Sequence, residues 1–260
     1  MPKLRFVTPV AVVVLVLLYA AWQVQPAWAQ QPVVVELFTS EGCSSCPPAD
    51  AMLIKLSQQR NSSIAKLILL EEHVEYWNGP GWIDRFSAPT YTQRQAEYEN
   101  NLHLATPYTP QIVIDGHVQV SGNDPRAVEE TILQVAKNPK PAAVSLRFVS
   151  PEKLQVVVDN PAHAKMEVLF AVTEDDLTSN VRGGENGGRT LKHSAVVREL
   201  HRLGTTADAK FDKTVNVPDK SDWKKSDLRA IVLVQNPSSG QILGAAEIPY
   251  TEAVPAIAGR

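Results

Sequence analysis

The feature that most restricts the fold is a short apolar run that leads directly into two closely spaced cysteines and two prolines. Residues 33–38, VVVELF, are almost continuously apolar, which is typical of a strand buried on both faces of a sheet. Cys43 and Cys46 follow this run. Pro47 and Pro48 come next and fit the first turn of a helix, where a missing backbone N–H costs nothing. The segment therefore predicts a strand that delivers a cysteine pair to the start of a helix over residues 47–59.

The pattern after this helix changes period several times. Residues 65–70 form a second buried strand, 88–103 are polar and compatible with a helix, and 111–115 with 118–121 form a hairpin. Asp124 is a suitable N-cap for a further helix. The order of strand, helix, strand, helical segment, hairpin and helix predicts an α/β domain of thioredoxin-like fold over residues 32–137.

A linker is expected at residues 137–141, because two prolines within three residues prevent a helix from continuing. Beyond it the apolar residues mostly recur at every second position, as in 144–148, 154–158 and 166–170. About seven short strands separated by turn residues predict a mostly antiparallel β-sandwich-like domain over residues 143–251.

The N-terminal segment has the order of a signal peptide. Lys3 and Arg5 precede an apolar run over residues 6–22, and Ala27-Trp28-Ala29 resembles a cleavage site. We expect residues 1–29 to be removed, which makes the protein periplasmic or secreted. The alternative is an uncleaved membrane anchor, because the apolar run approaches the length of a spanning helix.

The net charge excludes one class of partner. Loss of Lys3 and Arg5 with residues 1–29 changes the formal charge from −3 to −5. A mildly acidic chain has no electrostatic footprint for nucleic acid, so no nucleic-acid partner is expected. We expect a membrane partner only if the N-terminal segment stays attached.

The two cysteines are the only ones in the chain, and their spacing favours redox chemistry. A disulfide between Cys43 and Cys46 closes a very small loop and so adds little stability. The pair predicts a thiol–disulfide oxidoreductase in which Cys43 is the exposed nucleophile and Cys46 the more buried resolving thiol. The expected partner is a thiol or disulfide of a protein or small molecule in the exported compartment. We assign no cofactor.

Two alternatives to redox chemistry stay open at this point. The bridge could be inert. The protein could also be a non-catalytic binding module on a thioredoxin-like scaffold, for a protein partner or for a metal such as Cu(I), which prefers soft ligands. His73 could join the two thiolates as a ligand, but the sequence has no second Cys-x-x-Cys, and we assign no metal ligands from it.

Two further positions bear on the cysteine site. Thr109-Pro110 immediately precedes the strand at 111–115, where a cis proline would expose backbone groups of Thr109 to a substrate. Glu36 is a carboxylate in an apolar strand, and a buried carboxylate exchanges protons near neutrality. Glu36 is therefore a candidate proton relay. The alternative is a glutamate at a strand end that faces solvent.

Other candidate residues lie farther along the chain. His73 and Trp77 follow the second strand, at the sheet edge where ligand sites gather, although aromatic residues more often fill a core, so that structural roles are favoured over catalytic ones. Residues 183–189, GGENGGR, are too rich in glycine for a strand. They are either an ordinary surface loop or a flap that brings Arg189 or His193 near the dithiol.

Four separated motifs carry a family resemblance: VVVELFTSEGCSSCPPAD, HVEYWNGPGW, TPYTPQIVIDG and GGENGGRTLKHSAVVREL. Together they resemble the bacterial exported proteins of the domain-of-unknown-function 1223 family. The resemblance implies a thioredoxin-like fold with an appended β domain. It implies no activity.

Overall fold

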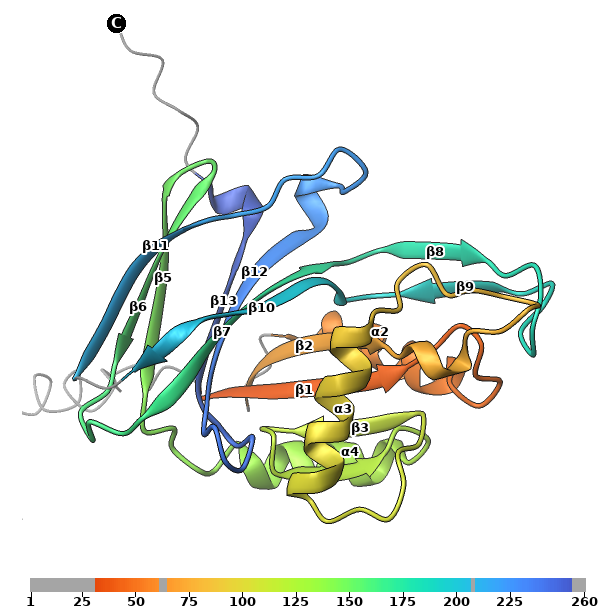
Figure 1. Ribbon diagram of the computed structural model, residues 1–260, viewed down its shortest axis with the longest axis horizontal. Helices are drawn as coiled ribbons and strands as arrows, with labels where there is room; N and C mark the ends of the chain where they lie inside the picture. The colour runs from red at the N-terminus through yellow and green to blue at the C-terminus, as the bar shows by residue number, and fades with distance from the viewer. Residues whose placement is uncertain (1–30, 61–64, 207–208, 254–260) are drawn as a thin grey trace, which may run out of the picture.

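The computed structural model describes residues 31–60, 65–206 and 209–253, and the predicted signal peptide at 1–29 lies outside them. One large mixed sheet dominates the described chain (Figure 1), with the strand order β13-β12-β7-β10-β2-β1-β3-β4. In chain order its strands are β1 (Pro32–Thr39), β2 (Lys66–His73), β3 (Gln111–Ile114), β4 (Val118–Ser121), β7 (Met166–Glu174), β10 (Val196–Thr206), β12 (Leu228–Gln235) and β13 (Ile242–Pro249).

The local elements predicted for the first half of the chain are present. α2 spans Pro47–Ser57, α3 spans Pro89–Asn101 and α4 spans Pro125–Val135. The N-cap at Asp124 is confirmed, because its side chain accepts a hydrogen bond from the Ala127 N–H at 3.0 Å. β1 and β2 pair in parallel, and β3 and β4 form the expected hairpin.

The predicted fold class was wrong. The described chain is mainly β-structure with an eight-stranded sheet, and it is not an α/β thioredoxin-like domain followed by a separate sandwich. The difference arises at β2, whose second edge pairs with β10 from the far side of the predicted linker. The apolar period identifies a strand but not its non-local neighbour. The predicted domain limits, 32–137 and 143–251, stay a prediction.

A second, three-stranded sheet packs on part of the large one. It has the order β11-β6-β5 and consists of β5 (Ala143–Ser150), β6 (Lys153–Asp159) and β11 (Lys210–Asn216). Phe148 and Leu154 from this sheet share an apolar core with Phe170 and Val232 from the large sheet. The sandwich-like packing predicted for the second half is thus present only as one part of a larger architecture.

A two-stranded ribbon extends beyond the large sheet and contacts α2 (Figure 1). It consists of β8 (Leu177–Asn180) and β9 (Thr190–His193), joined by residues 181–189, which we call the glycine-rich loop. The remaining described elements are three short 3-10 helices at Glu75–Trp77, Lys225–Asp227 and Tyr250–Glu252.

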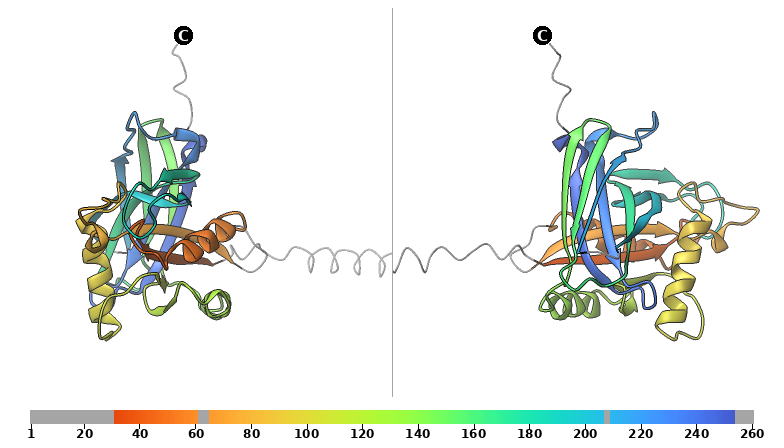
Figure 2. Two further views of the ribbon diagram at one scale, coloured as in Figure 1. Left: turned by 90° about the vertical axis from the view of Figure 1, so that its right-hand side faces the viewer. Right: turned by 60° about the vertical axis from the view of Figure 1, so that its left-hand side comes forward.

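The two faces of the sheet around β1 and β2 are covered by different helices, as Figure 2 shows. Side chains alternate between faces along a strand. Val35 and Leu37 pack with Leu53 of α2, whereas Phe38 packs with Tyr98 of α3. Each side chain on β1 or β2 therefore points either to the face covered by α2 or to the face covered by α3.

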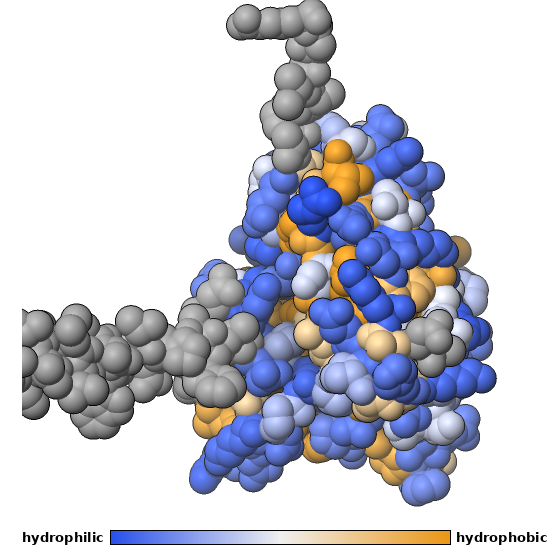
Figure 3. Space-filling view, turned by 90° about the vertical axis from the view of Figure 1, so that its left-hand side faces the viewer, coloured by the Kyte–Doolittle hydropathy of each residue, from blue (hydrophilic) through white to orange (hydrophobic). Residues whose placement is uncertain are grey.

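Across the residues that the structure describes, the surface drawn in Figure 3 shows no single large hydrophobic patch that would mark a binding site. On the side drawn in Figure 3, hydrophilic residues cover most of the molecule and hydrophobic residues appear in separate patches. In the parts of the chain that the structure describes, no helix is both long and apolar enough to cross a membrane. The features that stand out are instead buried: the two cysteines and a set of polar side chains near them.

Candidate functional site around the cysteine pair

Cys43 and Cys46 form a disulfide in the loop between β1 and α2. The loop turns tightly, because the Cys43 N–H donates to the Ser40 carbonyl at 3.1 Å and the Cys46 N–H donates to the Cys43 carbonyl at 3.2 Å. Cys46 occupies the N-cap position of α2, with proline in the first turn. The predicted placement of the pair at a strand-to-helix junction is confirmed.

The expectation that Cys43 is exposed was wrong. Both cysteines have 0% of their surface exposed, whereas Ser44 and Ser45 between them face solvent. A thiol that attacks either sulfur therefore needs part of the surrounding structure to move first.

The glycine-rich loop lies against the cysteine loop and contributes to this burial. The Asn186 amide Nδ2 donates to the carbonyls of Glu41 and Cys43, both at 2.9 Å. Glu185 accepts a hydrogen bond from the Ser44 N–H at 3.1 Å. Asn186 itself is fully buried. The flap interpretation of residues 183–189 thus agrees with the contacts, and the loop is not merely a surface connection.

Arg189 supports this contact indirectly. Its guanidinium donates to Asn186 Oδ1 at 2.7 Å and so holds the amide that bonds the cysteine loop. The backbones also approach closely, since a Cβ built on Gly183 would lie 1.9 Å from the Gly81 carbonyl oxygen. Glycine at position 183 is therefore required for the loop to pack where it does.

Thr109 and Pro110 immediately precede β3. The Thr109–Pro110 bond is cis, as predicted. Trp77 connects this segment to the cysteine loop, because its indole Nε1 donates to Thr109 Oγ1 at 2.8 Å and its backbone lies against Gly42. Trp77 is 37% exposed, so its ring offers an aromatic surface beside the disulfide. A role of Thr109 and Pro110 in positioning a substrate stays a prediction.

Glu36 is buried, which excludes the solvent-facing alternative, but it lies on the α3 face of the sheet. Its carboxylate accepts hydrogen bonds from Arg94 Nε and, at 2.6 Å, from the Tyr98 hydroxyl. Both partners belong to α3, on the face opposite α2 and the cysteines. The proton relay predicted at Glu36 is therefore not supported by its position.

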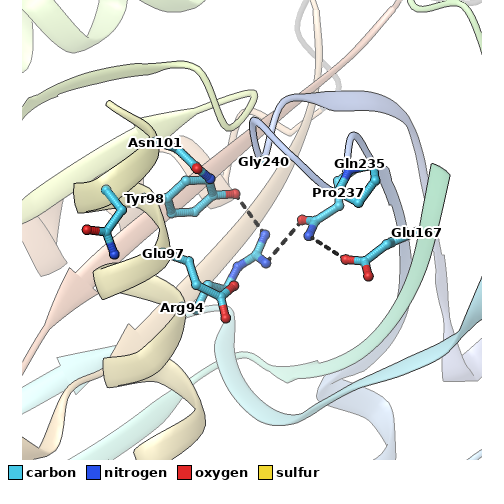
Figure 4. A pocket seen from close by; sticks show the side chains of 9 residues that line it. Arg94, Glu97, Tyr98, Asn101, Glu167, Gln235, Pro237 and Gly240 are labelled. Atoms are coloured by element: carbon cyan, nitrogen blue, oxygen red, sulfur yellow. Dashed lines mark hydrogen bonds between the residues drawn. The ribbon is translucent and has the colours of Figure 1, made fainter. Parts of the chain in front are cut away.

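Arg94 and Tyr98 also border a surface pocket of about 360 Å³, shown in Figure 4. Arg94 donates to Gln235 Oε1 at 3.2 Å across this pocket, which lies between α3 and the turn after β12. No cysteine or histidine lines it. The pocket is a separate feature, because neither cysteine of the disulfide is among its lining residues.

Asp50 is a second buried carboxyl group, and it lies on the α2 face of the sheet. It lies in the first turn of α2, is buried, and accepts a hydrogen bond from Thr39 Oγ1 at 2.7 Å. Burial, together with the charge of Glu71, raises the pKa of Asp50 to about 7, although His193 and His73 act in the opposite direction. A carboxyl group with this pKa exchanges protons near neutrality.

A buried cluster of histidines and carboxylates lies on this same face. His73 Nδ1 lies 2.7 Å from Asp84 Oδ2, and His73 Nε2 lies 3.3 Å from Glu71 Oε1. His193 Nδ1 lies 2.6 Å from Glu71 Oε1, and its Nε2 lies 3.6 Å from Glu41 Oε1. The structure thus brings together His73 and His193, both identified from the sequence, with their rings 4.9 Å apart.

The electrostatics of the cluster favour positive charge on its imidazoles. Burial lowers the pKa of His73, but the charge and hydrogen bond of Asp84 outweigh this and hold it well above its usual range. Burial also lowers the pKa of His193, yet the charge of Glu71 raises it to about 9. The described residues that could hold a metal ion are Glu71, His73 and His193, whose ligand atoms lie within 4.8 Å of one another.

Sequence comparison places these motifs in one family. The family of proteins of unknown function DUF1223 has a model that matches residues 34–235 of this chain. The chain belongs to the DUF1223 family. The match covers the cysteine loop, the cis proline and the glycine-rich loop, so the resemblance drawn from the four motifs is confirmed. No functionally curated protein matches the sequence.

Solved structures support the fold of this DUF1223 protein. It is similar to the crystal structure of a protein from Agrobacterium tumefaciens, with 29% sequence identity and a TM-score of 0.68, covering 85% of this chain and 96% of that one. A DUF4785 family protein from Legionella pneumophila is 11% identical with a TM-score of 0.29, covering 56% of this chain and 34% of that one. A domain of an outer membrane lipoprotein from Porphyromonas gingivalis is 12% identical with a TM-score of 0.23, covering 42% and 94%. The last two likenesses are too slight to carry an argument.

Proposed function

We propose that this DUF1223 protein is an exported thiol–disulfide oxidoreductase that reacts through Cys43 and Cys46. The observation that carries the proposal is the disulfide itself, which joins residues three positions apart at the start of a helix. A bridge that closes so small a loop contributes little to stability, which leaves redox chemistry as its physical role. Export rests on the signal-peptide pattern of residues 1–29.

The exchange balances as follows. The thiolate of a partner attacks Cys43 Sγ and forms a mixed disulfide, and the Cys43–Cys46 bond breaks with its electron pair on Cys46. The Cys46 thiolate then accepts a proton, for which Asp50, in the first turn of the same helix, has a pKa near neutrality. A second partner thiolate resolves the mixed disulfide, so that two partner thiols are oxidised and the cysteine pair is reduced. Reversal of these steps oxidises the pair.

Two surfaces support this role. Trp77 lies between the cysteine loop and Thr109, where its exposed ring can contact a peptide that pairs with the Thr109 backbone. The glycine-rich loop shields the disulfide through Asn186. Exchange therefore requires this loop to move, and the partner is a thiol or disulfide that reaches the site once it has done so.

Trapping tests the proposal. Cys46→Ser leaves Cys43 as the attacking thiol without a resolving partner, and it should accumulate mixed disulfides with glutathione disulfide or with an oxidised protein substrate. Cys43→Ser is the matched control and should accumulate far fewer. Non-reducing electrophoresis and mass spectrometry detect the adducts. Equal trapping by both variants overturns the assignment of Cys43, and no trapping by either, with thiols inert to alkylation, overturns the redox function.

A further inference from the structure

The buried histidines on the α2 face carry unpaired nitrogen atoms that hydrogen bonding within the protein does not explain. His73 Nε2 and His193 Nε2 have no hydrogen-bond partner, and neither has Glu41 Oε1 beside them. All three side chains are fully buried. Buried polar atoms almost always have a partner, and a bound ion is one of the few explanations for an exception.

We propose that Glu71, His73 and His193 bind a divalent transition metal ion, for which Zn²⁺ is the best chemical match. Two imidazoles and a carboxylate are ligands that Zn²⁺ takes readily, with an open position for a fourth. Glu41 Oε1 is the nearest further oxygen donor. The proposal uses neither sulfur atom, so it does not depend on the proposed redox function.

The donor atoms of the three residues lie within 4.8 Å of one another, and the ion would replace the contact of His193 Nδ1 with Glu71 Oε1 at 2.6 Å. Bonds of about 2.0–2.1 Å at tetrahedral angles place neighbouring donors roughly 3.3 Å apart. His73 Nε2 lies 3.3 Å from Glu71 Oε1, and His193 Nε2 lies 3.6 Å from Glu41 Oε1. The first distance matches two neighbouring ligands on one metal ion, and the second shows only that Glu41 Oε1 lies beside the His193 ring.

The surroundings hold His73 as a ligand. Its Nδ1 lies 2.7 Å from Asp84 Oδ2, which leaves Nε2 directed at Glu71. A carboxylate on the other ring nitrogen is the usual outer partner of a metal-binding histidine. Asp84 is itself fixed, because it accepts hydrogen bonds from the N–H groups of Glu41 and Phe86 at 2.8 and 2.9 Å.

The backbone brings the ligands together from rigid elements. Glu71 and His73 are two positions apart on β2 and so face the same side. His193 ends β9, and the next residues pair with β2, since the Glu71 N–H donates to the Ala195 carbonyl at 2.8 Å and the Ser194 N–H donates to Glu71 Oε2 at 3.0 Å. The ligand set therefore forms only when β2 joins the second half of the chain.

Charge balance also suits a divalent ion. Glu41, Glu71 and Asp84 surround two imidazoles, and the site compensates these carboxylates either with two imidazolium protons or with one divalent cation. A surface pocket of about 350 Å³ is lined by Lys192 and His193 and so lies next to the ligand set. Binding would release protons from the imidazoles.

The test uses the oxidised protein, stripped with a chelator and shown to contain no free thiol, titrated with ZnCl₂ in a calorimeter. We expect one Zn²⁺ per chain and proton release that varies with buffer. His193→Gln should weaken binding at least tenfold. Asp84→Asn should weaken it about 10- to 100-fold. His201→Gln is the matched control, because His201 also lies beside a glutamate, Glu199, at 3.1 Å but on the surface.

A measurement on the unaltered protein keeps the proposal testable if the variants do not fold. X-ray absorption at the zinc edge should count two histidine nitrogens and no sulfur. Cys43→Ser/Cys46→Ser should bind Zn²⁺ as tightly as the parent, whereas a thiolate site would be lost. Substoichiometric binding, a sulfur ligand, or equal weakening by His201→Gln and His193→Gln overturns the proposal and leaves two protonated histidines as the content of the cluster.

Discussion

Replacement of Asn186 by alanine should make the disulfide much easier to reduce. The Asn186 amide makes two buried hydrogen bonds to the cysteine loop, to the carbonyls of Glu41 and Cys43. Each contributes about 0.5–1.5 kcal/mol net, so their loss favours separation of the glycine-rich loop by about 1–3 kcal/mol. If reduction proceeds through the open form, the rate should rise roughly 5- to 150-fold.

The assay is the rate at which a water-soluble phosphine reduces the Cys43–Cys46 bond, followed by alkylation and mass spectrometry. Asn180→Ala is the matched control, because Asn180 lies on the same ribbon and bonds only Thr190 through its exposed side chain. Urea denaturation of both variants separates local opening from global unfolding. Equal rates for Asn186→Ala and Asn180→Ala, or acceleration that follows global stability, would refute the reasoning.

A second substitution should also separate the glycine-rich loop from the cysteine loop, by steric repulsion. Gly183→Ala places a methyl group 1.9 Å from the Gly81 carbonyl oxygen, so the loop must shift away. Reduction should again accelerate. Gly79→Ala, where a Cβ meets nothing within 4 Å, should leave the rate unchanged. Agreement between Asn186→Ala and Gly183→Ala would attribute the effect to loop displacement and not to a lost amide alone.

Three further predictions concern a buried acid, a buried cation and an exposed aromatic ring. In chelator-treated protein, Asp50 has a pKa of about 7 in the folded state and 3.8 in the unfolded state. Between these values the folded state holds a proton that the unfolded state has lost, so the free energy of unfolding falls as pH rises through that range. Asp50→Asn should therefore match the parent below pH ~4 and exceed it at pH ~8 by up to roughly 4 kcal/mol in urea denaturation. Arg94→Met removes the cation that compensates Glu36 and Glu72, which should cost about 3–5 kcal/mol in the same assay. Trp77→Ala should raise KM for peptide disulfides roughly tenfold, the equivalent of one aromatic contact, without changing the rate with a small phosphine.

The sequence predicted features that depend on near neighbours in the chain. Pro47 and Pro48 identified the start of α2, Asp124 the start of α4, and the Thr109-Pro110 pair a cis bond. Each of these depends on local backbone chemistry, such as a missing N–H or a capping carboxylate. The pairing of β2 with β10 depends on residues about 125 positions apart, and no local pattern specifies it.

The face of the sheet on which Glu36 lies could not be predicted for a related reason. Residues 33–38 are apolar on both faces, so their pattern does not say which face Glu36 shares with the cysteines. The structure shows that odd-numbered positions, such as Leu37 and Thr39, face α2. Asp50 could have been noticed as an acid one helical turn after Cys46. Glu71 is likewise a carboxylate in an apolar strand, but no local pattern points to it, because its partner His193 lies in a distant segment.

The second half of the chain completes the site that the first half begins. Cys43 and Asp50 come from the segment before the linker, whereas Asn186 and His193 arrive on the ribbon that follows β7. Glu41 connects the two groups, because its carbonyl accepts from Asn186 and its carboxylate faces His193. Movement of the glycine-rich loop therefore changes the surroundings of both the disulfide and the histidine cluster. Since coupling between two sites is reciprocal, a ligand that fixes Glu41 from the histidine side must also alter how readily the loop uncovers Cys43.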